Sequence, residues 1–464
     1  AIAIQTVYPF TIDGCTFNNN NAALGGGAIY IETTQSSGNV QYVAESGSIK
    51  NCEFSNCVTE SENGTILFIE NSLSTEITFS GNNKVTNKGE RGSVIYTQCK
   101  NLYANDLTFD FDSAGERNFR AALIAPGSKA TFTNCEFTGT GYTTNSQNGH
   151  AVLAQNNAER VVFDRCTFSN CGNNNREYAI YSTSLDLQFI GSTIQFTNQV
   201  SSCGGICCTH FSKLTVTDSL FKDIFANQTA AGAGICYNYN SNRGDPLNCD
   251  VILSGTTFDN LMSKNGRAAF FKLSKYSMIT NCTFKPVGNY ILVIGHSETT
   301  EPEGQTILDN VVFMDNKASV TDDGGGGGIG FWVSQVDRCL LENCKFIRNE
   351  NRKQSNGGAL GYSSTLSTSK VALEFISCRF EDNKVLPEFF GGALYINAEL
   401  KPVLIKSCVF SNTISDAAKL GGAIYISGAT KQRIDISDTD FINMKATFND
   451  KQNGNAIYIQ DEAS

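Results

Sequence analysis

Two short motifs alternate along the whole chain, and this repetition restricts the possible folds more than any other feature. The first motif ends in phenylalanine and often reads Cys-x-Phe, as at 15–17 and 135–137. The second is a glycine or glycine pair before a short apolar run, as in GGAIYI at 26–31 and 421–426. In the regular parts of the chain, successive phenylalanines are 30 or 31 residues apart. A unit of that size with three short strands cannot bury its own apolar face, so neighbouring units must stack.

Stacked coils of parallel strands, hydrogen-bonded about 4.8 Å apart, bury those faces. Helical periodicity is absent, which excludes the helical repeat families. Fifteen phenylalanine positions predict an all-β fold, a single right-handed parallel β-helix (solenoid) of about fifteen coils of about thirty residues. We expect one continuous domain over 1–464. Because the first and last coils are incomplete and carry no polar cap, we expect a segment of a longer chain, or self-association through the uncapped ends.

Charge and hydropathy exclude several classes of partner. The net charge is −10, and no basic stripe is present that could neutralise phosphates, so we expect no nucleic acid partner. The same charge disfavours anionic membrane surfaces. No run of about 18 apolar residues occurs, so we expect no membrane span in this segment.

Alternation along each strand predicts which side chains face the interior. In a Cys-x-Phe strand, Cys and Phe share one face, and the residue between them is mostly polar, so Cys and Phe face inward. Asn or Asp often follows two residues after Phe, where a left-handed turn tolerates it. We predict a ladder of these side chains at the corner after the strand, formed by Asn19, Asn56, Asn170, Asn198, Asp223, Asn260, Asp315, Asp382, Asn412 and Asn443. The glycine pair then begins the next strand, where a side chain would clash or φ is positive.

Phe-x-x-Asn combined with Gly-Gly-Ala-(Ile/Leu) resembles the repeats of chlamydial polymorphic outer-membrane proteins, and of large polymorphic surface-protein families in some parasitic protists. The first motif is complete in FNNN at 17–20, FMDN at 313–316, FIRN at 346–349 and FEDN at 380–383, and the second in GGAI at 26–29 and 421–424 and GGAL at 357–360 and 391–394. The resemblance is best over 1–32 and 310–464. It implies a surface-displayed, passenger-like β-helix, in several cases adhesive, and identifies no catalytic residue.

The chain has seventeen cysteines, of which eight occupy the Cys-x-Phe position, three of them in successive coils at Cys344, Cys378 and Cys408. In-register stacking would place their Cα atoms about 4.8 Å apart, but parallel Cβ vectors keep the Cβ atoms further apart than the ~3.8 Å that a disulfide prefers. We therefore predict buried thiols acting as small hydrophobes rather than a disulfide ladder. Cys203, Cys207 and Cys208 lack the paired ligand groups of a zinc module, so we expect no metal and no cofactor.

Tyrosines recur at one point of the glycine-led strand: Tyr30, Tyr96, Tyr181, Tyr395, Tyr425 and Tyr458. An outward strip of them could hold sugars or a partner. The simpler interpretation, which we favour, is a ladder of rings stacked on one another.

Loops on a rigid scaffold tend to carry function. The loop at 238–250 contains Arg243-Gly244-Asp245, a tripeptide that resembles the cell-attachment sequence read by integrin-type receptors. Cys236 and Cys249 flank it, and a disulfide between them would clamp the excursion. Three glycosylation sequons begin at Asn63, Asn227 and Asn281, and would be accessible if the chain passes through a secretory pathway.

These features predict a non-catalytic extracellular or cell-surface protein that acts as an adhesin or a structural spacer. Its partners would be a host or neighbouring-cell surface receptor or a glycan. One alternative is a carbohydrate-active enzyme, a polysaccharide lyase or hydrolase, because many parallel β-helices are such enzymes. Such an enzyme needs clustered carboxylates, and outward acids do not recur on neighbouring coils here. A further alternative is a subunit of an extracellular filament or lattice.

Overall fold

The computed structural model describes 27 segments of the chain, and every regular element in them is a β-strand, which confirms the all-β parallel β-helix class. The described residues are 1–6, 8–23, 25–32, 45–60, 64–86, 92–111, 119–139, 151–155, 157–171, 178–196, 204–209, 213–226, 233–238, 250–263, 267–272, 276–287, 290–295, 305–317, 331–334, 338–351, 356–363, 372–385, 389–397, 402–412, 418–427, 433–444 and 456–460. They form two compact units, Ala1–Ala230 and Ala231–Ser464, called units 1 and 2 below.

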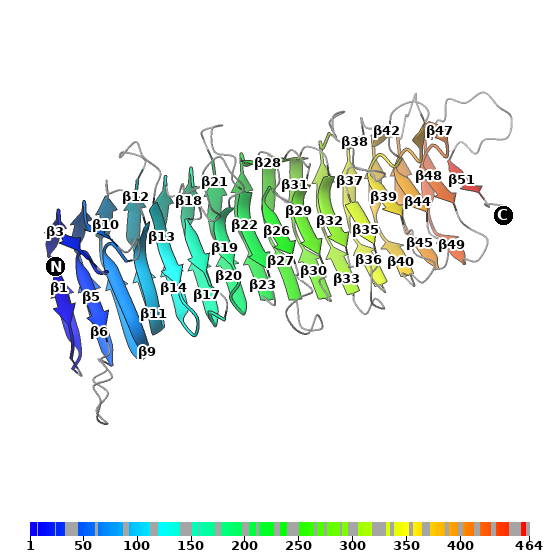
Figure 1. The fold of residues 1–464 in the computed structure, drawn as a ribbon. Coiled ribbons are helices and arrows are strands. Elements are labelled where there is room, and N and C mark those ends of the chain that lie inside the picture. The colour runs from blue at the N-terminus through cyan, green and yellow to red at the C-terminus, as the bar shows by residue number, and fades with distance from the viewer. Residues whose placement is uncertain are drawn as a thin grey trace. The chain divides into compact units, whose positions relative to one another are not determined.

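Unit 1 consists of three parallel strand ladders (Figure 1). The glycine ladder contains β1 (Ile2–Ile4), β5 (Ile29–Glu32), β13 (Phe119–Ile124), β16 (Val152–Ala154), β19 (Tyr178–Ser182) and β22 (Gly204–Thr209). The middle ladder contains β2 (Phe10–Asp13), β6 (Ser46–Lys50), β14 (Lys129–Thr133), β17 (Arg160–Asp164), β20 (Asp186–Ile190) and β23 (Lys213–Thr217). The long strands β9 (Leu67–Ser80) and β11 (Gly92–Asn105) belong to both, because each pairs with both ladders.

The phenylalanine ladder of unit 1 contains β3 (Thr16–Asn18), β7 (Glu53–Ser55), β10 (Asn83–Thr86), β12 (Leu107–Asp110), β15 (Glu136–Thr138), β18 (Thr167–Ser169), β21 (Thr193–Gln195) and β24 (Leu220–Lys222). Unit 1 also holds the short strands β4 (Asn21–Ala22) and β8 (Val58–Thr59), which pair with each other, and β25 (Phe225–Ala226). The short β4–β8 pair extends the stack beyond the corners that follow Phe17 and Phe54.

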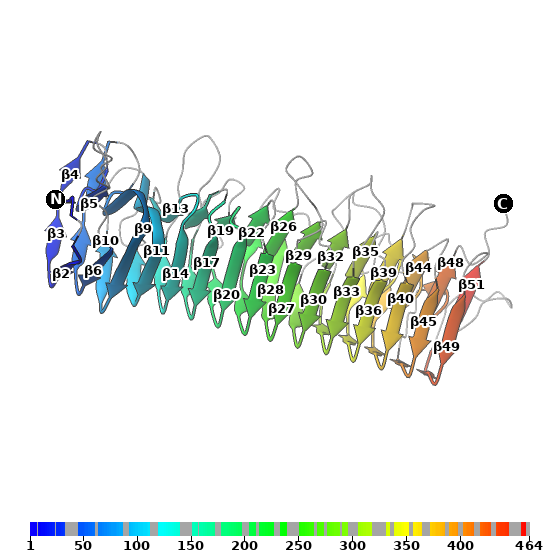
Figure 2. The same ribbon diagram turned by 90° about the horizontal axis from the view of Figure 1, so that it is seen from below.

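Unit 2 repeats this plan, as Figure 2 shows from below. Its glycine ladder contains β26 (Ile235–Asn238), β29 (Arg267–Lys272), β32 (Tyr290–Gly295), β35 (Phe331–Ser334), β39 (Leu360–Ser363), β44 (Leu394–Asn397), β48 (Ile424–Ser427) and β51 (Ile457–Gln460). Its middle ladder contains β27 (Asp250–Ser254), β30 (Tyr276–Thr280), β33 (Gln305–Asp309), β36 (Arg338–Glu342), β40 (Ala372–Ile376), β45 (Val403–Lys406) and β49 (Ile434–Ser437).

The phenylalanine ladder of unit 2 contains β28 (Thr257–Ser263), β31 (Thr283–Val287), β34 (Val312–Met314), β37 (Lys345–Ile347), β41 (Arg379–Glu381), β46 (Val409–Ser411) and β50 (Asp440–Ile442). Short pairs form between β38 (Glu350–Asn351) and β42 (Lys384–Val385), and between β43 (Phe389–Phe390) and β47 (Ala418–Leu420). Among the described residues this ladder has eight strands in unit 1 and seven in unit 2, so neither unit by itself holds the fifteen coils expected of one solenoid. One continuous domain over 1–464 stays a prediction.

The core of each unit is a column of phenylalanine rings, as the repeat predicts. Phe137 and Phe168 are paired in register with ring centroids 4.3 Å apart, and both are fully buried. In unit 2, consecutive rings from Phe258 to Phe441 stack with centroids 4.6–5.1 Å apart. In unit 1, Val85 and Ile194 interrupt the stack. Parallel in-register pairing places equivalent side chains above one another, so one apolar residue at the same position of each coil builds a continuous core.

The chain turns sharply at both ends of the phenylalanine strand, and both corners use left-handed backbone. Two residues after Phe, the predicted corner is confirmed by positive φ at Asn19, Asn56, Asn170, Asp223, Asn260, Asp315, Asp382, Asn412 and Asn443, while Asn198 lies outside the described residues. A second set, directly before the Cys position, was not predicted and comprises Gly14, Asn51, Asp106, Asn134, Arg165, Gly191, Asp218, Gly255, Asn281, Asn310, Asn343, Ser377, Ser407 and Asp438. Asn, Asp and Gly tolerate this conformation best, which explains their abundance.

Two separate physical constraints explain the two glycines of the pair, as the GGAL at 357–360 illustrates. Gly357 has φ of +79°, in the left-handed region. A Cβ on Gly358 would lie 2.1 Å from the carbonyl oxygen of Gly392 in the next coil, so no larger residue fits. Ala359 then faces the core, fully buried. The prediction that the pair marks a clash or a positive φ holds, one reason for each glycine.

We predict that Phe346→Ala lowers the free energy of unfolding by roughly 3–5 kcal/mol, measured by urea denaturation. Phe346 is fully buried, with ring centroids 4.8 Å from both Phe313 and Phe380, so truncation leaves a cavity within the column. Ile347→Ala is the matched control, because Ile347 is only partly buried on the other face of the same strand. Equal losses for the two variants would contradict an interior ring column.

Candidate functional site

The most distinctive polar feature is the column formed by the first residue of each Cys-x-Phe triplet, which we call the corner column. Strand register aligns its members: in unit 1 they are Cys15, Cys52, Asn83, Leu107, Cys135, Cys166, Ser192 and Ser219, and in unit 2 Thr256, Cys282, Val311, Cys344, Cys378, Cys408 and Thr439. All but Cys15 and Thr439 are buried. Most members carry a thiol, hydroxyl or amide, so the column is defined by hydrogen-bonding capacity more than by cysteine.

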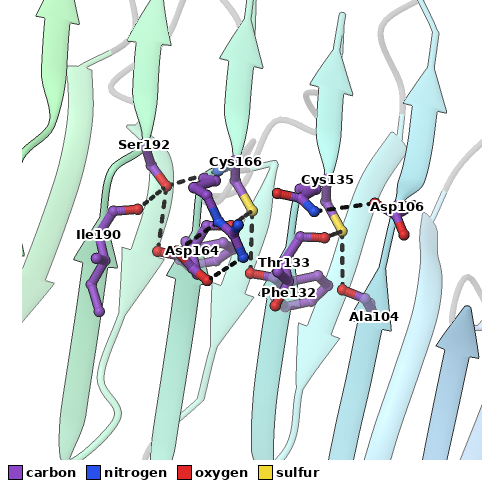
Figure 3. Close-up of polar contacts among 12 residues, drawn as sticks. Ala104, Asp106, Phe132, Thr133, Cys135, Asp164, Cys166, Ile190 and Ser192 are labelled. Atoms are coloured by element: carbon purple, nitrogen blue, oxygen red, sulfur yellow. Dashed lines mark hydrogen bonds and ion pairs between the residues drawn. The ribbon is translucent and has the colours of Figure 1, made fainter.

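Each polar member of the corner column reaches backbone carbonyl oxygens at the corner. Figure 3 shows Cys166, whose Sγ lies 3.5 Å from the carbonyl oxygen of Asp164 and 3.3 Å from that of Phe132 in the preceding coil. The hydroxyl of Ser192 does the same in the next coil, donating to Ile190 at 2.8 Å and to Phe163 at 3.3 Å. It also accepts a bond from the backbone N–H of Cys166 at 2.8 Å. One side chain therefore joins two coils where the chain turns.

The three successive cysteines of unit 2 follow the same rule. Sγ of Cys378 lies 3.3 Å from the carbonyl oxygen of Leu341 and 3.5 Å from that of Ile376. Cys344 and Cys408 make the equivalent pairs at 3.3–3.6 Å. All three are free thiols, which agrees with the prediction of thiols over disulfides. The predicted role as small hydrophobes was incomplete, because the thiols also donate to backbone carbonyls at the strand end, such as that of Ile376, which accepts the N–H of Asn343 as well.

Burial makes these thiols chemically quiet. Desolvation raises the pKa of the corner-column thiol of Cys166, and outside the column it raises the pKa of Cys99, which bonds the Thr97 hydroxyl at 2.9 Å, to about 12. It also raises the pKa of Cys339, which is fully buried. The thiolate is the nucleophile and the metal ligand, so protonated buried thiols supply neither. Within the described residues, no three His, Cys, Asp or Glu side chains gather as a metal site would require.

A second buried polar column follows the phenylalanine strand in unit 2. The Nδ2 atoms of Asn316 and Asn349 donate to the Oδ1 atoms of Asn349 and Asn383, at 2.7 and 3.0 Å. Each Nδ2 also donates to the carbonyl of a phenylalanine in the coil before, as Asn383 does to Phe346 at 2.8 Å. These are the asparagines of the Phe-x-x-Asn motif. The predicted ladder two residues after Phe supplies the corner and is at least partly exposed at every described position except Asn170. This buried ladder, three residues after Phe, was missed.

The recurrent tyrosines other than Tyr181 form the predicted ring ladder on the outer face of the glycine ladder, and Tyr181 packs against the aliphatic cluster that contains Leu153. In unit 1, Phe68 stacks between Tyr30 and Tyr96, with centroids 5.5 and 4.7 Å apart. In unit 2, Tyr425 stacks on Tyr395 and Tyr458 at 5.5 and 5.6 Å. Because each ring covers the faces of its neighbours, the faces that a sugar would stack on are taken within the ladder.

Several surface charges near the ladders pair between coils. The guanidinium of Arg348 forms two bonds to the carboxylate of Asp315, at 2.7 and 2.8 Å, and this holds the pKa of Asp315 below its usual value. The pKa of Glu76 is also lowered, by a hydrogen bond from Asn101 and by Lys100. A general acid needs the opposite shift, a raised carboxyl pKa. These groups therefore act as inter-coil ties.

Most of the sequence-predicted site residues lie outside the described residues: Arg243, Gly244, Asp245, Cys249, Asn63 and Asn227. Cys236 is in β26 and only 3% exposed. The Cys236–Cys249 bridge stays a prediction. Asn281 is exposed at the corner before Cys282, with φ of +54°, and its glycosylation stays a prediction. No helix long and apolar enough to cross a bilayer occurs in the described part of the chain.

Together, the ladders, corner columns and Phe-x-x-Asn/Gly-Gly-Ala repeat define a parallel β-helix repeat protein. Residues 14–32 match the model of the Chlamydia polymorphic membrane protein repeat. The matched segment spans one corner column member, one phenylalanine and one Gly-Gly-Ala-Ile, the same features that build each coil. The match bears out the predicted resemblance, and a repeat of this kind indicates a surface or outer-membrane protein with a β-helix. No curated protein and no solved structure matches the chain.

The raised pKa of Cys99 predicts a loss of stability in alkali. The unfolded chain releases this proton near 9.0 and the folded chain near 12, so the stabilisation is complete below pH 9 and falls as pH rises, by up to about 1.4 kcal/mol per pH unit. We expect Cys99→Ser to lose less stability than the native chain between pH 8 and pH 10.5, measured by urea denaturation. Cys15→Ser is the control, because Cys15 is partly exposed. An unchanged pH slope in Cys99→Ser would contradict the buried, protonated thiol.

Proposed function

We propose that the protein is a non-catalytic cell-surface or extracellular β-helix that acts as an adhesin. A structural spacer on the same β-helix, without a receptor, is the simpler form of this proposal. The proposal rests on the observation that the described polar side chains bond the backbone or one another within the scaffold. Thiols, amides and hydroxyls of the corner columns bond the backbone, and arginines and carboxylates tie coils together. The regular part of each coil is thereby committed to the scaffold, which leaves recognition to the loops between strands.

The loop between β26 and β27 is the best candidate for recognition. It leaves the glycine ladder after Asn238 and re-enters the middle ladder at Asp250, so two ladders fix both of its ends. Its sequence carries Arg243-Gly244-Asp245, one cationic and one anionic side chain separated by glycine. A receptor or glycan that reads both charges is the partner this loop would suit. The match to a surface-protein repeat supports the placement outside the cell.

The alternative function is a carbohydrate-active enzyme on the same fold. The lowered pKa values of Asp315 and Glu76 make these two carboxyl groups poor general acids, since neighbours hold both ionised. Turnover of pectins, alginates or related acidic glycans that is abolished by a single Asp or Glu substitution would establish the enzyme. The third possibility, a filament or lattice subunit, predicts concentration-dependent assembly by light scattering and no cell attachment.

The test of the adhesin is attachment of cells to surfaces coated with the chain. We predict that Asp245→Glu reduces attachment about tenfold or more, because the added methylene displaces the carboxylate from its place in a desolvated charge pair, and breaking such a pair costs about 2–5 kcal/mol. Asp440→Glu is the matched control, the same chemical change at an exposed strand position of unit 2, and should leave attachment unchanged. Equal attachment to the native chain and Asp245→Glu would remove the receptor role of the tripeptide, and no attachment to the native chain would leave the spacer.

A further inference from the structure

The exposed corner before the phenylalanine strand carries amide side chains that point one way. In unit 1, Nδ2 of Asn134 donates to Oδ1 of Asp106 in the preceding coil, at 3.2 Å. In unit 2, Nδ2 of Asn310 donates to Oδ1 of Asn281 at 2.8 Å, and Nδ2 of Asn343 donates to Asp309 at 3.0 Å. In each of these pairs, which we call rungs, the amide nitrogen donates to the preceding coil, and the oxygen that accepts the bond belongs to a residue of that preceding coil.

Asn281 is the point where this series of rungs in unit 2 begins. Its oxygen accepts the bond from Asn310, so its nitrogen faces the preceding coil. The pairs Ser254↔Thr280 and Thr257↔Thr283 place Gly255 at the equivalent corner of that coil. Glycine has no side chain to accept the bond, and the hydroxyl of Ser254 before it accepts a bond from the Thr280 hydroxyl at 3.1 Å. The nitrogen of Asn281 is therefore directed toward a corner that carries no side chain, on an exposed part of the surface.

We propose that Asn281 is an N-glycosylation site of this protein, an inference that rests on the extracellular or surface placement in the proposed function. Asn281-Cys282-Thr283 is a sequon. The oligosaccharide would come from a donor linked through pyrophosphate to a polyprenol lipid. A bond forms between Nδ2 and C1 of the first sugar, the bond from C1 to the pyrophosphate oxygen breaks, and Nδ2 gives up one proton.

The corner can carry the sugar without losing its structural bonds. Glycosylation changes Nδ2 and leaves Oδ1 in place, so the bond from Asn310 survives. The backbone N–H of Asn281 still donates to the carbonyl oxygen of Asp309, at 3.0 Å. Cys282 is fully buried, and its thiol bonds the carbonyl of Thr280, so the strand remains anchored from the inside. The other two sequons, at Asn63 and Asn227, lie outside the described residues.

The experiment is secretion of the full chain from eukaryotic cells behind an appended signal, followed by peptide mapping with and without peptide N-glycosidase. We expect a glycosidase-sensitive glycan on Asn281 that is lost in both Asn281→Gln and Thr283→Ala. Lys345→Thr is the matched control, since it creates the sequon Asn343-Cys344-Thr at a corner whose Nδ2 is already bonded to Asp309. The glycan at Asn281 should leave the melting temperature equal to that of Thr283→Ala, whereas occupancy at Asn343 should lower it.

A secreted chain without a glycan at Asn281 would overturn the inference. So would a glycan at Asn281 that lowers the melting temperature as much as the one at Asn343. Neither result bears on cell attachment, which is measured with unmodified chain, so the glycosylation site and the adhesin can fail separately. Peptide mapping of the protein from the cells that make it tests the same site on native material, with occupancy expected at Asn281.

Discussion

The structure depends on closing a coil every thirty or so residues without leaving backbone carbonyls unpaired at the turn. A buried carbonyl without a partner costs about 1–3 kcal/mol, and a solenoid meets this problem again in each coil. At this corner the backbone N–H before most Cys positions bonds the strand-end carbonyl of the next coil, as that of Asn343 bonds Ile376 at 3.0 Å. The corner column adds one short polar side chain in every described coil except those of Leu107 and Val311. Sγ of Cys166 and Oγ of Ser192 each bond one carbonyl in their own coil and one in the coil before. The turn and the stacking of coils are thus stabilised by the same side chain.

In-register stacking explains why so few residue types dominate the chain. A position that holds phenylalanine in one coil meets phenylalanine in the next, as Phe346 and Phe380 do, and two parallel rings fit that spacing. Asparagines that stack can bond each other, as Asn349 and Asn383 do. Gly358, which precedes the next strand, lies so close to the carbonyl oxygen of Gly392 in the coil after it that no side chain fits at Gly358. Each ladder therefore favours its own repetition, and surface ion pairs add only modest inter-coil ties.

Much of this could be predicted from the repeat. Alternation fixes the faces of a strand, so the interior phenylalanines followed directly, and the preference of asparagine for left-handed backbone located corners such as Asn412. The corner directly before the Cys position was missed because its residue type varies between coils, as Asn281, Ser377 and Arg165 show. The corner column was interpreted as a column of cysteines alone, because the sequence pattern shows residue type. Ser192 and Thr256 make the same kind of hydrogen bond as the cysteines but differ from them in residue type. The loop with Arg243-Gly244-Asp245 has no repeat to define it, so pattern reasoning could name the tripeptide and no more.

The sharpest test of corner closure by a side-chain hydrogen bond is the free energy of unfolding of Cys378→Ser and Cys378→Ala. Serine keeps a donor within reach of Leu341 and Ile376, whereas alanine leaves both carbonyls without it. We expect the serine variant to stay within about 1 kcal/mol of the native chain, and the alanine variant to be less stable than the serine variant by about 1–2 kcal/mol. An alanine variant as stable as the serine variant would show that the column works by apolar packing alone, and would contradict closure of the corner by hydrogen bonds.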